Sequence, residues 1–256
     1  MPKQKILYIT TEMFPYREES NIANMVSKMA LKTHQQSDVR VFMPKFGAIS
    51  ERRFQLHEVI RLSGMNIIIN DLDQPLIIKV ASLPGERLQV YFIDNEEYFK
   101  RRFYYSDENG IPFSDNAERA VFFARGVLET IKKLNWVPDV IHFNGWMSSF
   151  IPLYLKTFYK NDFYFNNTKL VLSVYNEENY DLGETLADVL KFDGIKDIDA
   201  TDYSTSQKFV IKSMDLVDVV IKGDEFLKGE IDEAFNNTKT QKFEFLDSDS
   251  IGQIYK

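Results

Sequence analysis

Short apolar runs recur along the chain and predict buried β-strands. Most are continuous rather than alternating, a pattern typical of parallel strands covered on both faces. The predicted strands are Lys5–Thr10, Asp38–Met43, Met65–Asn70, Pro75–Ala81, Leu88–Asp94, Pro138–Phe143, Lys169–Tyr175 and Leu216–Lys222. The runs between Met65 and Asp94 lie close together and are broken by Asn70-Asp71 and Pro84-Gly85. That spacing predicts antiparallel hairpins or a meander inserted in the sheet.

Amphipathic stretches between these runs predict helices. The clearest is Ser114–Leu134, where Asp115 can cap the first turn and Glu118 can reach back to the cap. The other predicted helices are Asn21–Thr33, Met147–Tyr159, which Pro152 interrupts early, and Thr205–Met214.

The alternation of strands and helices predicts an α/β fold with a doubly wound, mainly parallel, Rossmann-like sheet. We assign residues 1–234 to this single domain. Residues 235–256 are polar and weakly periodic, and we assign them to a C-terminal tail of uncertain order.

Composition narrows the classes of function. A net charge of −7 argues against binding nucleic acid, which requires a basic surface, and against an anionic membrane. Without cysteine there are no disulfides, thiolate metal sites or cysteine nucleophile. No metal-binding, P-loop or G-x-G-x-x-G motif is present, so we predict neither metal nor cofactor. The start lacks the features of a signal peptide and no apolar run reaches roughly 18 residues, so we expect a cytoplasmic chain without a transmembrane helix.

Ligands of open α/β sheets bind beyond the carboxyl ends of the strands. This rule selects the loops at residues 11–21, 144–146 and 176–180, which we expect to act together. The first loop leads into a helix, and a helix N-terminus suits phosphate. Ser20 and Asn21, however, stand where glycines would let a phosphate approach the backbone.

Charge also weighs against phosphate in the first loop. Glu18 and Glu19 are acidic, and Arg17 is the only cation nearby in sequence. The alternative is an acidic first turn that complements the helix dipole. Glu12, at the end of the first strand, is either a ligand-facing carboxylate or a solvated acid.

Two further residues each allow two interpretations. Trp146 follows a strand, where it could stack on a sugar ring or serve as a packing residue. His142 lies inside a strand pattern, which favours a hydrogen-bonded core histidine over a catalytic one.

Several motifs occur in an order that is specific, although each one alone is weak. They are KILYITTE at Lys5–Glu12 followed by Pro15, DVRVFMPKFG at Asp38–Gly47, VYFIDNEEYF at Val90–Phe99, DNAER at Asp115–Arg119 followed by Phe122-Phe123, and WVPDVIH at Trp136–His142 followed by Trp146. Over roughly residues 5 to 180 the chain resembles the N-terminal half of bacterial glycogen synthases and plant starch synthases.

This resemblance implies a retaining transfer of glucose from ADP-glucose to the non-reducing end of an α-1,4-glucan, without a metal. It implies two Rossmann-like domains with the active site between them, the nucleotide being held mostly by the C-terminal one. The N-terminal domain would supply a Lys-x-Gly-Gly loop, acceptor contacts and a histidine. Four residues match family site positions: Glu12, Tyr98, Trp146 and Asn176.

The chain departs from the family where the chemistry occurs. Glu18 replaces the family's lysine, Ser20 and Asn21 replace its two glycines, and Asn24 replaces a nearby aspartate. Asn144 and Gly145 replace the first two residues of a His-Asp-Trp element, and Tyr175 replaces a histidine that precedes an asparagine. Losing one preorganised charge at a transition state typically costs about 3–4 kcal/mol.

These substitutions leave no catalytic residue that we can assign. Our hypothesis is a glycogen/starch-synthase-like glycosyltransferase domain that is inactive or weak as this lone chain. The alternatives are a non-catalytic module that binds glucan or protein, and one half of a split glycosyltransferase. The candidate partners are an α-glucan, a nucleotide sugar, and a protein at the face where a second domain would dock.

Overall fold

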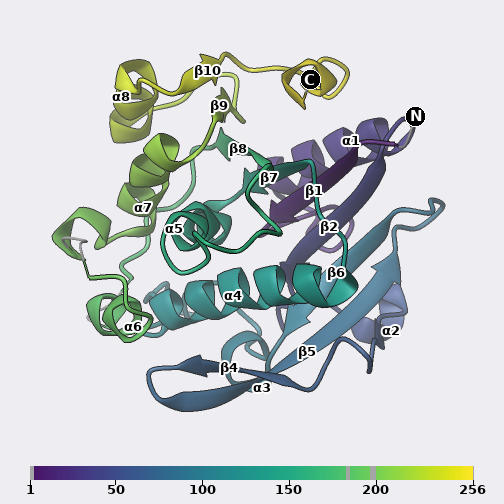
Figure 1. Cartoon of the computed structure of the whole chain (residues 1–256), viewed down its shortest axis with the longest axis vertical. Coiled ribbons are helices and arrows are strands. Elements are labelled where there is room, and N and C mark those ends of the chain that lie inside the picture. The colour runs from purple at the N-terminus through teal and green to yellow at the C-terminus, as the bar shows by residue number, and fades with distance from the viewer. Residues whose placement is uncertain (1–2, 183–184, 197–199, 256) are drawn as a thin grey trace.

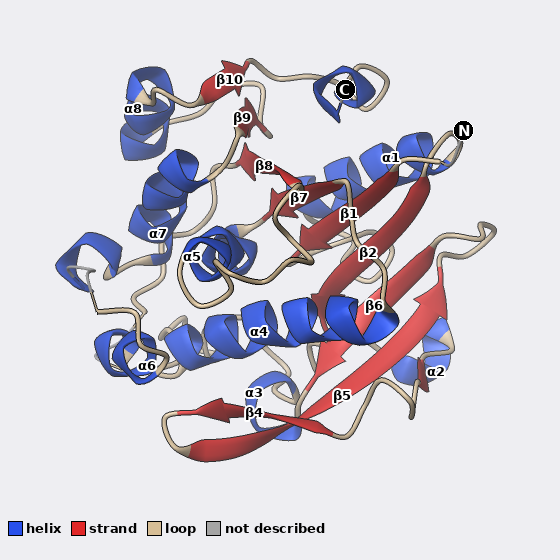
Figure 2. Cartoon of the chain, viewed as in Figure 1, coloured by secondary structure: helices blue, strands red, loops and turns tan. Residues whose placement is uncertain are grey.

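The computed structural model describes residues 3–182, 185–196 and 200–255. A mixed sheet forms its centre, in the order β10-β9-β8-β7-β1-β2-β6-β5-β3, and β4 pairs with β5 (Figure 2). The strands are β1 (Lys5–Thr10), β2 (Asp38–Pro44), β3 (His57–Glu58), β4 (Met65–Ile69), β5 (Leu72–Ser82), β6 (Gln89–Asp94), β7 (Val140–Asn144), β8 (Lys169–Val174), β9 (Val219–Lys222) and β10 (Gln241–Phe243).

Helices cover both faces of the sheet (Figure 1). They are α1 (Asn21–His34), α2 (Glu51–Phe54), α3 (Glu96–Phe99), α4 (Asn116–Leu134), α5 (Phe150–Lys156), α6 (Leu186–Phe192), α7 (Ser206–Ser213) and α8 (Gly229–Asn237), with short 3₁₀ turns η1 (Trp146–Ser149), η2 (Ala200–Tyr203), η3 (Met214–Leu216) and η4 (Ile251–Tyr255). The predicted α/β class and mainly parallel sheet are confirmed.

The order of the central strands creates a switch point. β1 pairs in parallel with β2 on one side and with β7 on the other. The chain leaves β1 toward β2 through α1, and leaves β7 toward β8 through α5. Because parallel crossovers are right-handed, these two opposite directions place α1 and α5 on opposite faces (Figure 2). A crevice is therefore expected at the carboxyl ends of these strands.

The predicted meander is also confirmed. β4 and β5 form an antiparallel hairpin, and β5 pairs antiparallel with β6, which is itself parallel to β2. The hairpin turns at Asn70 and Asp71, both of which have positive φ, at 46° and 67°. Positive φ at both central residues is typical of the two-residue hairpin turn whose twist matches that of the flanking strands.

The predicted cap of the long helix α4 is wrong. The Asp115 carboxylate makes no cap hydrogen bond and instead accepts two from the Arg101 guanidinium, both at 2.6 Å. Glu118 accepts from the Tyr98 hydroxyl and the Asn70 amide rather than reaching back. A bidentate, charge-assisted pair is stronger than a neutral backbone donor, so tertiary partners outcompete the local motif.

The predicted helix at Met147–Tyr159 is shorter in the structure and ends at Lys156. It begins as the 3₁₀ turn η1 and becomes α-helical at Phe150. Pro152 lies in the first turn of α5, where a missing N–H is tolerated.

The C-terminal segment packs back onto the sheet. β10 extends it beside β9, and η4 buries the Tyr255 ring. The Tyr255 hydroxyl bonds the Tyr8 hydroxyl at 2.6 Å and His142 Nδ1 at 2.7 Å, while His142 Nε2 bonds the Ser173 hydroxyl at 2.7 Å. Burial lowers the pKa of His142 to about 3. His142 is thus a hydrogen-bonded core histidine; the domain boundary at residue 234 stays a prediction.

In the described ranges, the helices are all too short or too polar to cross a membrane.

Candidate functional site

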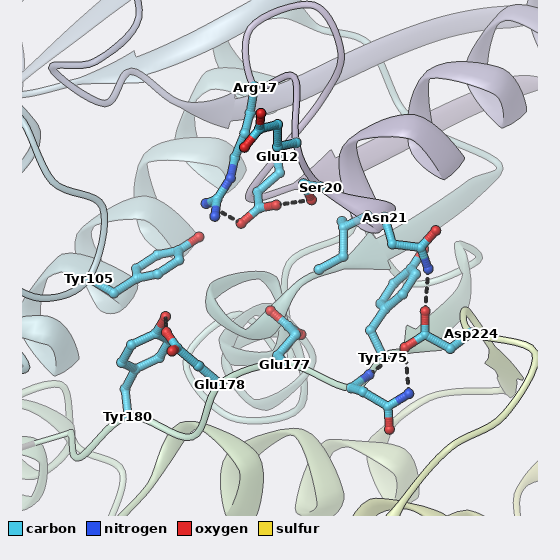
Figure 3. A pocket seen from close by; sticks show the side chains of 13 residues that line it. Glu12, Arg17, Ser20, Asn21, Tyr105, Tyr175, Glu177, Glu178, Tyr180 and Asp224 are labelled. Carbon is cyan, nitrogen blue, oxygen red and sulfur yellow. Dashed lines mark hydrogen bonds and ion pairs between the residues drawn. The ribbon is translucent and has the colours of Figure 1, made fainter. Parts of the chain in front are cut away.

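A pocket of about 230 Å³ opens at the carboxyl edge of the sheet, beside the switch point. Its walls come from the loops after β1, β8 and β9, and from Tyr105 in the irregular segment between α3 and α4 (Figure 3). Two of the three loops selected from the sequence, residues 11–21 and 176–180, therefore meet as predicted. The loop at 144–146 lies beneath them.

Glu12 holds one wall of the pocket together. It is 5% exposed, and its Oε1 accepts a hydrogen bond from Arg17 Nη1 at 2.5 Å, while Oε2 accepts from the Ser20 hydroxyl. Burial raises the pKa of Glu12, and the Arg17 charge partly offsets this rise. The guanidinium also lies 4.3 Å from the ring centroid of Tyr104. Arg17 is therefore engaged by an acid and an aromatic face rather than presented to a ligand.

Asp224, from the loop after β9, joins the opposite wall. It accepts from the backbone N–H of Asn176 at 2.6 Å, from the Asn176 amide at 2.8 Å and from the Asn21 amide. The Asn176 amide also donates to the Phe226 carbonyl at 2.8 Å. Asn176 thus ties the β8 loop to the β9 loop and positions the Asp224 carboxylate.

Glu177 lies between these two walls. Its Oε2 accepts from the Trp146 backbone N–H at 3.1 Å. Burial, together with the negative charge of Glu12, raises the pKa of Glu177 to about 8. At neutral pH this carboxyl is mainly protonated, so it can donate a hydrogen bond as well as accept one.

The replaced residues of the first loop do not all reach the pocket. Ser20 caps α1, accepting from the Ala23 N–H at 3.2 Å, and with Asn21 it lines the pocket. Glu18 instead pairs with Arg53 at 2.7 Å on the surface. Asn24 lies on the exposed face of α1.

The replaced residues at 144, 145 and 175 form the floor. The Tyr175 hydroxyl donates to Asn144 Oδ1 at 2.8 Å, and the Asn144 amide donates to the His142 carbonyl at 3.2 Å. Gly145 has φ +80°, and a Cβ there would lie 1.9 Å from Thr11 Oγ1. No side chain fits at this position, so the family's acidic residue could not be placed here without moving the first loop.

Two matched family positions are buried and do not line this pocket. Trp146 is 1% exposed and packs against Tyr105, Tyr180 and Phe150, so of its two interpretations the packing one describes the structure. Tyr98 is buried in α3, where its hydroxyl donates to Glu118 at 3.1 Å. Glu12 and Asn176, the other two matched positions, line the pocket.

Sequence reasoning missed Asp224 and Tyr105. Asp224 follows a parallel strand, so the carboxyl-end rule could have selected it had it been applied to β9. Tyr105 lies in an irregular segment that carries no periodic or motif signal.

The lining can accept many hydrogen bonds but offers little to an anion. Arg17 is its one cation in the described part of the chain, and Glu12 neutralises it. Glu19, Glu178 and Asp224 lack a cationic partner among the described salt bridges, which makes the pocket acidic. Those ranges also hold no group of three His, Cys, Asp or Glu side chains arranged to bind a metal.

Comparison with known proteins agrees with the fold. The starch synthase catalytic domain family matches residues 5–242. The glycogen synthases of Chlorobium limicola and Chlorobaculum tepidum are 38% and 37% identical over 174 residues, which make up 67% of this chain and 36% of each relative. The catalytic domain of Arabidopsis thaliana starch synthase IV, solved with ADP and acarbose, superposes with a TM-score of 0.66 at 16% identity, covering 86% of this chain and 45% of that one.

The structural likeness shows the fold, and the sequence matches show the family. The matched region spans little more than a third of the bacterial relatives' length. The family match nevertheless runs through nearly all the described strands, from β1 into β10. This chain belongs to the glycogen/starch synthase family.

Proposed function

We propose that this domain binds a carbohydrate in the pocket but does not, as this chain, transfer glucose from ADP-glucose. The observation that carries the proposal is the Glu12–Arg17 ion pair, which neutralises the pocket's cation. A diphosphate at this edge would meet uncompensated carboxylates. Repulsion between like charges would weaken its binding and remove transition-state stabilisation.

The remaining lining suits a neutral or hydroxyl-rich ligand. Carboxylates and amide oxygens accept hydrogen bonds from sugar hydroxyls, and the half-buried Tyr180 offers aromatic surface. The volume of about 230 Å³ lies below the roughly 300–1,000 Å³ of pockets for drug-sized ligands. A monosaccharide unit matches this size better than a nucleoside diphosphate sugar does.

The first test is transfer itself. Purified protein is incubated with ADP-glucose and glycogen, and incorporated glucose is measured beside a bacterial glycogen synthase. We expect a rate at least about a hundredfold lower, because one lost oxyanion-type contact alone has that effect. Robust transfer would overturn the proposal.

The second test is binding. Calorimetry with maltotriose, acarbose and ADP distinguishes carbohydrate binding from nucleotide binding. We expect heat from the sugars only, and Tyr180→Phe should weaken it. The matched control is Tyr164→Phe, which removes a tyrosine hydroxyl that bonds Asn135 outside the pocket. Binding of ADP but of no sugar would contradict the proposal.

A second candidate function is one half of a split glycosyltransferase. Two exposed aromatic side chains in loops that supply pocket residues favour it: Phe226, after β9, is 73% exposed, and Phe14, after β1, is 45% exposed. Such surface is typical of a protein interface. Co-purification of a Rossmann-fold protein that confers ADP-glucose-dependent transfer would support this role, and Phe226→Ala should abolish the association. Transfer activity equal with and without that protein would contradict it.

A further inference from the structure

The pocket carries more negative charge than its own cation can balance. Glu12 is paired with Arg17, whereas Asp224 accepts hydrogen bonds from the Asn176 backbone N–H and from the side-chain amides of Asn176 and Asn21, and pairs with no cation among the described salt bridges. Glu19 and Glu178 add two more carboxylates to the lining. The N-terminus of α1 contributes roughly half a positive charge, which does not offset them.

A second feature is independent of the acids. Tyr105 is 5% exposed, and its hydroxyl has no hydrogen-bond partner among the residues that the structure describes. Figure 3 shows this hydroxyl pointing toward Glu12 and Arg17 across the pocket. The nearby Thr11 hydroxyl influences the pKa of Tyr105, but neither hydroxyl makes a well-formed hydrogen bond. A buried hydroxyl without a partner is costly, so a ligand that supplied the partner would bind more tightly.

The arrangement suits an organic cation better than a metal ion. The described residues contain no cluster of three ligating side chains, because the carboxylates are spread around the walls instead of converging. The half-buried ring of Tyr180, which packs against Tyr105, borders the same space (Figure 3), and aromatic faces attract ammonium groups. A hydroxylated ammonium compound would use the carboxylates, the Tyr180 ring and the Tyr105 hydroxyl together.

We propose that the pocket formed by the loops after β1, β8 and β9 with Tyr105 binds a sugar that carries a protonated amine. The inference rests on the proposed function, since it names the class of carbohydrate that the same site takes. The ammonium group lies beside Glu177, between the two walls, and the sugar hydroxyls bond Asp224 on one wall and the Tyr105 hydroxyl on the other.

Binding of an ammonium ion is coupled to a proton. The charged groups that face Glu177 are Glu12, Asp224 and Arg17. A cation beside Glu177 favours its ionised form and lowers the pKa of the carboxyl from about 8. At pH 7 the complex therefore releases a proton from Glu177.

The experiment is calorimetry of the full chain at pH 7 with glucosamine, glucose and N-acetylglucosamine. These probes share a ring and differ in the charge at one position. We expect glucosamine to bind at least tenfold more tightly than either neutral sugar, and its affinity to fall with salt. Titrations in two buffers of different ionisation enthalpy should reveal proton release.

Three variants sharpen the test. Asp224→Asn and Tyr105→Phe should each weaken glucosamine binding by at least fivefold. Glu86→Gln, an exposed acid in the turn between β5 and β6, should not change it. Equal loss in Asp224→Asn and Glu86→Gln would mean a general surface effect and would overturn the inference.

The outcomes separate this inference from the proposed function. If glucose or maltotriose binds as well as glucosamine does, the amine is not recognised and only the inference fails. If no sugar binds at 10 mM while ADP does, both fail. Tight glucosamine binding without proton release contradicts the placement beside Glu177 and requires another site.

Discussion

Replacing Arg17 with alanine would leave the Glu12 carboxylate buried without its cation. Breaking a buried ion pair typically costs about 3–5 kcal/mol of stability. Since the Arg17 side chain is 31% exposed, solvent screens part of the charge, and we expect a loss of about 2–3 kcal/mol at pH 8. Glu12 can also escape the penalty by taking up a proton.

That escape makes the loss depend on pH. Protonating a carboxyl whose unfolded pKa is 4.5 costs about 1.4 kcal/mol per pH unit above that value. The stability that Arg17→Ala can lose is therefore at most about 5 kcal/mol at pH 8 and at most about 1 kcal/mol at pH 5. The folded pKa of Glu12 is raised, so the folded state binds more protons than the unfolded one, and stability falls as pH rises through that window. Removing Arg17 raises the pKa of Glu12 further, so stability continues to fall up to a higher pH.

Urea unfolding of the wild type and Arg17→Ala at pH 5 and pH 8 measures this difference. The double variant Glu12→Gln with Arg17→Ala removes the buried charge, and it should regain most of the stability and lose the pH dependence. Arg53→Ala breaks the exposed pair with Glu18, whose side chains are 63% and 56% exposed, so it should change stability by less than about 1 kcal/mol. An equal loss for Arg17→Ala at both pH values would refute the reasoning.

Two further predictions concern the floor and core of the site. Gly145→Ala places a Cβ 1.9 Å from Thr11 Oγ1 at a positive φ, so thermal unfolding should show a stability loss of more than about 2 kcal/mol. The control is Gly110→Ala, which has a similar φ but open space around the Cβ, and its stability loss should be only about 1–2 kcal/mol. Burial lowers the folded pKa of His142 from 6.5 to about 3, so the unfolded chain takes up this proton first. Stability should therefore fall as pH drops from 6.5 toward 3, by about 1.4 kcal/mol per pH unit. His142→Asn should remove that contribution from the pH dependence of urea unfolding, and an unchanged slope would contradict it.

Much of the scaffold was predictable because it depends on local patterns. Continuous apolar runs identified β1 to its last residue, and the broken runs from Met65 onward identified the antiparallel meander. Parallel strands share one carboxyl edge, so the loops after β1 and β8 had to approach each other. The ordered motifs identified the family over the same stretch.

The hydrogen-bond and packing partners of individual side chains were not predictable from the sequence. Asp115 and Glu118 have a capping spacing, yet Arg101 and Tyr98 hold them instead. Trp146 follows a strand as a sugar-stacking residue would, but neighbouring rings bury it. In each case groups distant in sequence compete for one side chain, and the strongest or best-packed partner prevails.

The charge of the pocket also depends partly on the sequence and partly on the tertiary structure. The sequence by itself determined that the first loop is rich in acids and holds one arginine. Only the tertiary structure decided that Glu12 pairs with that arginine and that Asp224 joins the pocket from the loop after β9. It also placed the Tyr105 hydroxyl at the pocket with no hydrogen-bond partner in the described ranges. The physical reason is that burial and distance, not composition, determine which charges are neutralised and which remain for a ligand.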